Sequence, residues 1–192
     1  MKTRNLATRY KLPALDWGAV RARLEQPFPQ APGSGGPNHH TTWLITINPD
    51  GSPHVTAVGA VFLDGTFWFQ TGPNTQKAKN LARDPRCSIS LGTDEFDLAL
   101  DGEARKVTES GTVARMAARW AADGWPVRVD DSGTGLTAAF SAPSAGPPPW
   151  YVYRVVARSA TAVGTIGDGG ATSWEFEPTL ADSGNSGARR TG

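Results

Sequence analysis

The chain has 192 residues, of which 39% are apolar, and a formal net charge of +1. This length and apolar share suit a single domain with its own core, and the small net charge gives no general attraction to nucleic acid or to anionic membranes. The lone cysteine, Cys87, excludes an internal disulfide and a cysteine-built metal site. The sequence shows neither a signal-peptide pattern nor an apolar run of membrane-spanning length, so we expect a cytoplasmic protein without nucleic-acid or membrane partners.

Composition divides the chain into three parts. We predict an N-terminal extension over residues 1–14, an ordered domain over 15–178 and a disordered polar tail over 179–192. Near the start of the domain, a short helix is expected from Asp16, which can cap it, to about Leu24.

Strands dominate the next part of the domain. The runs with β-branched and aromatic bias are residues 42–47, 54–63 and 66–71. Short turns separate them, and the second turn, Asp64-Gly65, suits the positive φ angles of a type I′ hairpin. Three strands joined in this way predict an antiparallel meander.

Helices then alternate with further strands. We expect a short helix over residues 74–83, capped by Asn74 or Thr75 and ended before Pro85, and an alanine-rich helix over 110–122. Further strands are expected at residues 87–91, 98–107, 150–156, 161–166 and 172–176. The pattern indicates a mainly β protein, an antiparallel barrel that is closed or nearly closed, with short flanking helices.

The turn before the first of these two helices could bind an anion. It reads Gln70-Thr71-Gly72-Pro73-Asn74-Thr75-Gln76-Lys77. The first N–H groups of a helix have no partner inside it, and the helix dipole favours negative charge there. Lys77 would add a full positive charge, so the turn suits a phosphate ester. A capped surface helix that carries a lysine is the commoner meaning of such a pattern.

Residues 53–90, PHVTAVGAVFLDGTFWFQTGPNTQKAKNLARDPRCSIS, resemble the cofactor-binding half of the pyridoxamine 5′-phosphate oxidase-like family, which are split β-barrel flavin and deazaflavin proteins. The positions that match the family pattern are Lys77, Asn80, Leu81, Asp84, Pro85 and Arg86. The segments GWPVRV and PPPWYVYRVVARSATAVG resemble the actinobacterial branch, many of whose members use coenzyme F420, a deazaflavin. The resemblance covers most of residues 15–176 and implies an antiparallel split β-barrel of the FMN-binding type.

The resemblance also implies where the cofactor binds. Lys77 would contact its phosphate, with Thr75 and Gln76 beside it, and Thr71 would add a strand-end hydroxyl. Asn80 belongs to the matching Lys-x-x-Asn-Leu motif. The strand whose backbone runs along the isoalloxazine or deazaflavin ring would carry His54, Val55, Thr56, Ala57 and Val58.

Two departures from the family pattern bear on the activity. Thr56 and Gln76 stand where true pyridoxamine 5′-phosphate oxidases place arginines, and their C-terminal Arg-x-His motif has no counterpart here. These departures argue against tight FMN binding and against the vitamin B6 reaction. The hypothesis is therefore a homodimeric oxidoreductase with cofactor sites at the interface, which transfers hydride from reduced coenzyme F420 to an unidentified small organic acceptor. The alternatives are an FMN-binding oxidoreductase, or a non-catalytic cofactor- or haem-binding protein of the same barrel.

The histidines and tryptophans are considered as metal ligands, catalytic groups or pocket walls. A metal site is not expected, because the neighbours His39 and His40 would point to opposite sides and no carboxylate is suitably spaced near them or His54. No residue is identified as a catalytic acid or base. Trp120, Trp125 and Trp150 could line a pocket wall, with core packing as the favoured role.

The remaining reactive or charged residues also have plain explanations. Cys87 is expected to be a small core residue. Asp94, Glu95 and Asp97 are assigned to a solvated connection between strands, and Arg115 and Arg119 to a wet helix face.

Overall fold

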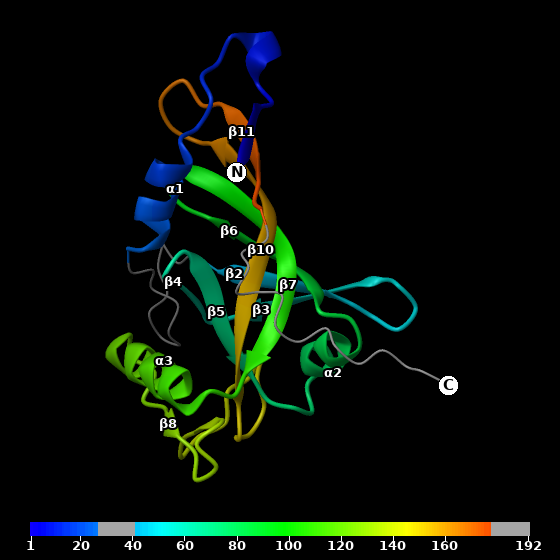
Figure 1. Cartoon of the computed structure of the whole chain (residues 1–192), viewed down its shortest axis with the longest axis vertical. Coiled ribbons are helices and arrows are strands. Elements are labelled where there is room, and N and C mark those ends of the chain that lie inside the picture. The colour runs from blue at the N-terminus through cyan, green and yellow to red at the C-terminus, as the bar shows by residue number, and fades with distance from the viewer. Residues whose placement is uncertain (27–40, 178–192) are drawn as a thin grey trace.

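The computed structural model describes residues 1–26 and 41–177, which form one nine-stranded antiparallel sheet, a small two-stranded sheet and three α-helices (Figure 1). The strands are β1 (Lys2–Asn5), β2 (Thr42–Ile47), β3 (Pro53–Val58), β4 (Ala60–Leu63), β5 (Thr66–Thr71), β6 (Arg86–Gly92), β7 (Phe96–Val107), β8 (Arg128–Val129), β9 (Leu136–Thr137), β10 (Tyr151–Gly164) and β11 (Ala171–Glu175). The helices are α1 (Trp17–Leu24), α2 (Gln76–Arg83), α3 (Ser110–Ala122) and a short 3-10 helix, η1 (Thr8–Tyr10).

The large sheet curls around its longest strands, β7 and β10, which run along the molecule in Figure 1. One edge of β10 pairs with β7, and the other pairs first with β5 and then with β11. The curl ends at β3 on one side and at β4 on the other, and Gly59 joins these two strands. No pairing among the described strands closes the circle. The predicted mainly β, antiparallel split-barrel class is confirmed, with a barrel that is not closed.

The strand expected over residues 54–63 is two strands, β3 and β4. They separate at Gly59 because β3 pairs with β2 whereas β4 pairs with β5, so the chain must bend between two sides of the curled sheet. A glycine commonly marks such a bend in a strand. The opposite correction applies to residues 150–156 and 161–166, which belong to the single strand β10 with an irregular register between Ala157 and Ser159.

Local signals at the turns and caps were predicted well. Asp64 and Gly65 both have positive φ angles, 54° and 76°, as a type I′ turn needs. Asp16 caps α1 by accepting a hydrogen bond from Ala19 N. Strand β1 was not predicted, because its four residues carry no alternating apolar pattern and its partner, β11, lies near the other end of the described chain. The predicted tail over 179–192 lies outside the described residues.

Two apolar clusters fill the structure, one on each face of β5. Phe67 and Phe69 point into the curled sheet, whereas Trp68 packs under α3, as the alternation of side chains along a strand requires. Trp120 and Trp150 are buried in the cluster beneath α3, which confirms core packing for both. Trp125 packs at the edge of that cluster and is half-buried.

Cys87 belongs to the cluster inside the sheet, as predicted. Its burial raises the pKa of its thiol to about 12, so the thiolate is not populated near neutral pH. Cys87 is therefore a core residue whose thiol is kept protonated by burial.

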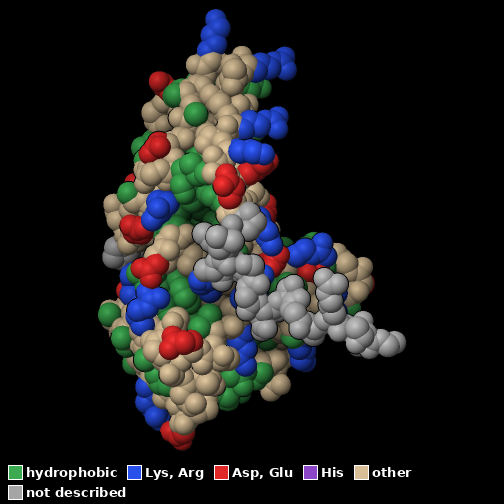
Figure 2. Space-filling view, in the orientation of Figure 1, with side chains coloured by type: hydrophobic (Ala, Val, Ile, Leu, Met, Phe, Trp, Pro, Cys, Tyr) green, Lys and Arg blue, Asp and Glu red, His purple; other side chains and the backbone are tan. Residues whose placement is uncertain are grey.

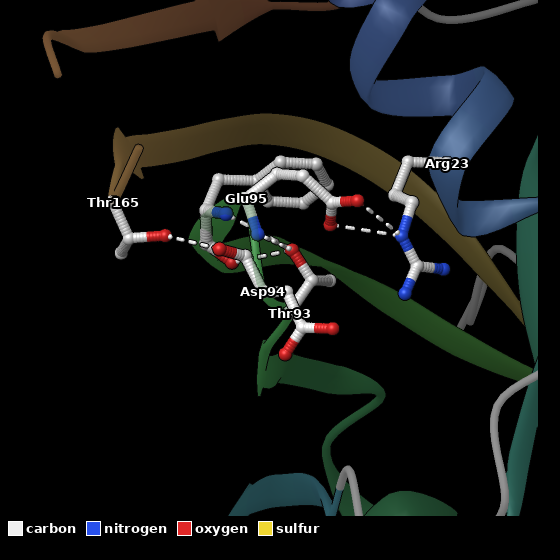
Figure 3. Close-up of polar contacts among 6 residues, drawn as sticks. Arg23, Thr93, Asp94, Glu95 and Thr165 are labelled. Atoms are coloured by element: carbon white, nitrogen blue, oxygen red, sulfur yellow. Dashed lines mark hydrogen bonds and ion pairs between the residues drawn. The ribbon is translucent and has the colours of Figure 1, made fainter. Parts of the chain in front are cut away.

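The turn between β6 and β7 corrects one sequence interpretation. Glu95 is not merely solvated, because its carboxylate accepts two hydrogen bonds from Arg23 Nε on α1, at 2.8 and 3.0 Å (Figure 3). Thr93 Oγ1 accepts from the backbone N–H of Glu95, and Thr165 Oγ1 donates to the carbonyl oxygen of Asp94. These contacts fasten the turn to α1 and to the segment after β10.

The surface carries charges of both signs. On the face shown in Figure 2, acidic side chains lie among the basic ones, in keeping with a net charge near zero. Arg115 and Arg119 lie on the outer side of α3 with part-exposed side chains, and they pair with Asp64 and Asp123. None of the described helices is both long and apolar enough to cross a membrane.

Candidate functional site

The turn from β5 into α2 is held together by two threonine hydroxyls. Thr75 is the N-cap of α2: its Oγ1 accepts a hydrogen bond from Ala78 N at 3.3 Å and donates to the carbonyl oxygen of Gly72 at 2.9 Å. Thr71, fully buried at the end of β5, has its Oγ1 3.0 Å from Thr75 Oγ1. Both hydroxyls therefore fix the shape of the turn from which α2 begins.

Lys77 is the unusual residue of this turn. Its side chain is 3% exposed, and its Nζ donates a hydrogen bond to the backbone carbonyl oxygen of Ser144. No carboxylate pairs with it among the residues in 1–26 and 41–177. Burial lowers the pKa of Lys77 below the usual lysine value. A buried cation is costly unless it is paired, so this ammonium lies where an anion would be strongly attracted.

The segment from Ala142 to Pro149 lies directly against the turn. The N–H of Gly72 donates to the carbonyl oxygen of Ala145 at 3.1 Å, beside the bond from Lys77 to Ser144. A pocket of about 200 Å³ lies between the turn and this segment, and its walls are residues 72–75 and 145–149. Two donors of the turn are thus bound to carbonyl oxygens of a segment far away in the sequence.

Asn80 and Gln76 join α2 to the sheet. Asn80 is 1% exposed, and its Nδ2 donates to Thr46 Oγ1 at 3.1 Å and to Asn48 Oδ1 at 3.0 Å. The exposed side chain of Gln76 donates to Asn80 Oδ1 at 2.8 Å. The amide of Asn80 is therefore engaged in holding α2 against β2, while its role in cofactor binding stays a prediction.

Strand β3 carries the five residues expected along the cofactor ring. Its backbone register places His54, Thr56 and Val58 on the face shared with the buried Thr46, and Val55 and Ala57 on the opposite face. All five side chains therefore cannot line one ring. Strand β3 ends the sheet and pairs only with β2 among the described strands, so its free backbone edge is the part that could follow a ring.

The expected site residues are thus close but not contiguous. Thr71, Thr75, Gln76, Lys77 and Asn80 meet around the start of α2. Strand β3 is separated from the start of α2 by one strand, β2. Thr46 of β2 bonds to Asn80 on one side and pairs with His54 of β3 on the other.

Comparison with known proteins places this arrangement in a family. The model of the pyridoxamine 5′-phosphate oxidase family matches residues 36–140, which is more than half of the chain. The chain belongs to this family. Members of the pyridoxamine 5′-phosphate oxidase family use flavin-type cofactors for oxidation and reduction. No curated protein matches the chain.

Solved structures share the fold at low sequence identity. The conserved hypothetical protein Rv2991 from Mycobacterium tuberculosis is 21% identical, with a TM-score of 0.50 over 78% of this chain and 84% of that one. A candidate pyridoxamine 5′-phosphate oxidase from Listeria innocua is 18% identical, with a TM-score of 0.50 over 74% and 94%. A candidate 5-nitroimidazole antibiotic resistance protein from Bacteroides thetaiotaomicron is 13% identical, with a TM-score of 0.53 over 91% and 92%. These likenesses concern the fold.

The turn fits the phosphate of a cofactor of the pyridoxamine 5′-phosphate oxidase family by the chemistry of its donors. The ammonium of Lys77 and the N–H of Gly72 already hold oxygen acceptors, and a phosphate oxygen is an acceptor of the same kind. The backbone N–H groups of Gln76 and Lys77 lie in the first turn of α2, where no intrahelical partner exists. A phosphate would take the places of the two carbonyl oxygens.

Sequence reasoning missed one segment that contacts this turn. It is the segment from Ala142 to Pro149, because Ser144 lies 67 positions from Lys77 and a Pro/Gly-rich stretch indicates only irregular structure. Gln70, the first residue of the predicted turn, is 7% exposed, and its Oε1 has no hydrogen-bond partner in the described part of the chain. No sequence pattern indicated this, because it depends on the packing around β5.

The described residues contain no cluster of three His, Cys, Asp or Glu side chains that could hold a metal ion. His39 and His40 lie outside the described residues, and His54 is the third histidine of the sequence.

Proposed function

We propose that the protein is an oxidoreductase that binds coenzyme F420 and passes hydride from its reduced form to a small organic acceptor. The observation that carries the proposal is the buried ammonium of Lys77, which has no carboxylate partner among the described residues, in a family that uses flavin-type cofactors. When bound, the deazaflavin would supply the hydride chemistry, and the protein would supply binding and orientation.

Each part of the site has a role in this proposal. Lys77, the N–H of Gly72 and the first-turn amides of α2 would hold the phosphate. Thr71 and Thr75 would keep the turn in shape beside it. The free edge of β3 would run along the ring, through backbone groups rather than through all five side chains. A hydride donor needs no protein acid or base, and we assign none.

The charge of the site supports F420 over FMN. Lys77 is the one cation in residues 70–77, and Thr56 and Gln76 are uncharged where the vitamin B6 oxidases have arginines. The phosphate of FMN is a monoester that carries about −1.5 to −2 charges at neutral pH. The phosphate that follows the ribityl chain in F420 is a diester with a single negative charge. One cation matches the diester better than the monoester.

A second copy of the chain completes the proposed site. The outer face of β2 and β3 exposes apolar side chains, with Val55 54% and Trp43 46% exposed and Ile45 and Ala57 between them. Burying such a patch favours association, and it borders the β3 edge assigned to the ring. We therefore expect a homodimer with cofactor sites at the interface.

A binding titration tests the proposal. Purified apoprotein is titrated separately with F420 and FMN while ligand fluorescence is followed, and sedimentation velocity of the same sample reports the dimer. We expect F420 to bind at micromolar concentration or better, and FMN at least about tenfold more weakly, a difference of ~1.4 kcal/mol. Oxidation of bound, reduced F420 by a panel of small organic acceptors then tests turnover.

Each other outcome has a definite meaning. Tighter FMN binding would replace the proposal with the FMN-dependent alternative. Tight F420 binding without turnover would indicate a cofactor carrier. Binding of neither cofactor would refute the proposed function, and a monomer would remove the second copy from the site.

A further inference from the structure

The segment from Ala142 to Pro149 occupies the position that the proposed phosphate requires. The carbonyl oxygens of Ser144 and Ala145 accept hydrogen bonds from Lys77 Nζ and from Gly72 N. Both donors belong to the turn that leads into α2. Two adjacent carbonyl oxygens of one segment thus stand where two oxygens of a phosphate group would bind.

An anion would compete well for these donors. The ammonium of Lys77 forms a charge-assisted hydrogen bond with a carbonyl oxygen or with a phosphate oxygen, but only the phosphate adds the attraction between two opposite charges. The side chain is nearly fully buried, so the low dielectric strengthens its attraction to a negative charge. The contact to Ser144 satisfies a hydrogen bond but does not neutralise the buried cation.

The segment is built so that it can leave as a unit. It is folded on itself by hydrogen bonds between Ala142 and Gly146 and from Ala145 N to the Ala142 carbonyl oxygen, and these bonds need not break when it moves. The apolar anchors that its departure would expose are the small side chains of Ala142 and Ala145. Their exposure costs about 0.8 kcal/mol for each methyl-sized group. Trp150, which follows the segment, is tied to Leu136 by two backbone hydrogen bonds and would stay in place. Departure of the segment therefore also breaks the hydrogen bond from Trp150 Nε1 to the carbonyl oxygen of Gly146, which is 2.9 Å long.

Gln70 is a buried polar residue near the same cluster. Its side chain lies on the face of β5 that carries Trp68, a member of the cluster into which Ala142 and Ala145 pack. The Oε1 atom is buried and has no donor among the described residues. An unsatisfied buried acceptor costs about 1–3 kcal/mol, so this face of β5 is not fully satisfied in the arrangement described.

We propose that the segment Ala142–Pro149 is a displaceable cover, which occupies the phosphate subsite in the free protein and is expelled by the phosphate group of the cofactor. The proposal rests on the proposed function, because it takes the phosphate of a flavin-type cofactor as the ligand. The cover would regulate that site, because the measured affinity for the cofactor then includes the free energy of displacing the segment.

Gly146→Ala loosens the cover without altering the donors. Gly146 has a positive φ of 74°, which alanine adopts only with strain, and no heavy atom beyond its chain neighbours lies within 4 Å of the position of its Cβ, so the strain falls on the fold of the segment while Gly72 and Lys77 are unchanged. We expect peptides spanning residues 142–149 to exchange hydrogen at least about tenfold faster in the variant, and F420 to bind about three- to tenfold more tightly, because part of the opening cost has been removed. Gly167→Ala is the matched control, since Gly167 has a positive φ of 61° and equally open space in the loop between β10 and β11, and it should change neither quantity.

Hydrogen exchange of the wild-type chain provides a second measurement that does not depend on how well Gly146→Ala folds. Saturating F420, or FMN if FMN is the tighter ligand, should speed exchange in residues 142–149. Slower or unchanged exchange with bound cofactor would overturn the cover alone. Absence of binding to the wild type and to both variants would overturn the cover together with the proposed function. A third outcome would also overturn the cover: faster exchange in the wild type on binding, but unchanged affinity in a folded Gly146→Ala whose segment is loosened.

Discussion

Two cations of this protein join segments that are far apart in the sequence, and they do so differently. Arg23 of α1 bonds to Glu95, an acidic partner in the turn between β6 and β7 (Figure 3). Lys77 of α2 bonds to a neutral carbonyl oxygen of Ser144. The first contact is a complete ion pair at the surface, whereas the second leaves a buried positive charge. The first contact fastens the fold, and the second involves the cation that we propose to bind the cofactor phosphate.

The pKa shifts show the same contrast. Burial alone would raise the pKa of Glu95, but hydrogen bonds from Arg23 and Thr93 together with the charge of Arg23 lower it below its usual value. Burial lowers the pKa of Lys77, and no other influence opposes it. A carboxylate is therefore stabilised in its charged form at one place, and an ammonium is destabilised at the other.

The largest effect is expected for Lys77→Met. Loss of the ammonium should weaken F420 binding by about 1.5–3 kcal/mol, roughly 10- to 150-fold, because a charge-assisted hydrogen bond is removed. The free energy of unfolding of the apoprotein should stay the same or rise, since a buried unpaired charge is removed from the core. Titration and urea unfolding measure the two quantities. Lys79→Met, on the exposed side of the same helix, should change neither.

The pH dependence of this comparison separates lost charge from lost shape. The folded pKa of Lys77 lies below 10.5, so the unfolded chain binds more protons in the interval between the two values. The wild type should therefore gain stability relative to Lys77→Met as pH rises through that interval. F420 affinity should fall over the same range in the wild type only. An equal fall in both proteins would exclude titration of Lys77 as its cause.

A smaller effect is expected for Asn80→Ala. This change removes the hydrogen bonds to Thr46 and Asn48 in a buried place, and should lower the free energy of unfolding by about 1–2 kcal/mol. Gln76→Ala, at an exposed position, should cost less than about 0.5 kcal/mol. If Asn80→Ala instead weakens F420 binding without affecting stability, Asn80 is a cofactor ligand rather than a structural residue.

The smallest effect is expected for Glu95→Gln. The ion pair with Arg23 is partly exposed, with 39% of the Glu95 side chain accessible, so its loss should cost about 0.5–1 kcal/mol and leave F420 binding unchanged. Because the folded pKa is lowered from 4.5, this contribution is present above that value and lost as pH falls through the folded pKa. Unfolding measured against pH checks both points. Glu25→Gln, which breaks the more exposed ion pair with Arg21, should lower the free energy of unfolding by less. An equal loss in both variants would show that the pair of Glu95 with Arg23 stabilises the fold no more than an ordinary surface pair.

The sequence by itself determined the local features of this protein and its family pattern. The positive φ angles at Asp64 and Gly65 and the cap Asp16 depend on a few neighbouring residues, so short patterns predicted them. The cap of α2 was narrowed to Asn74 or Thr75 in the same way, and the structure selects Thr75. The position of Lys77 in the first turn of α2 was equally local, and the resemblance gave it a role that the local pattern could not.

Only the tertiary structure decided what surrounds those features. The break at Gly59, the bond between Arg23 and Glu95, and the segment against Lys77 all depend on how the sheet curls. Sequence patterns describe intervals of a few residues, whereas these contacts join residues 72 and 67 positions apart. Their energies come from burial and charge after the chain has folded, so no local pattern contained them.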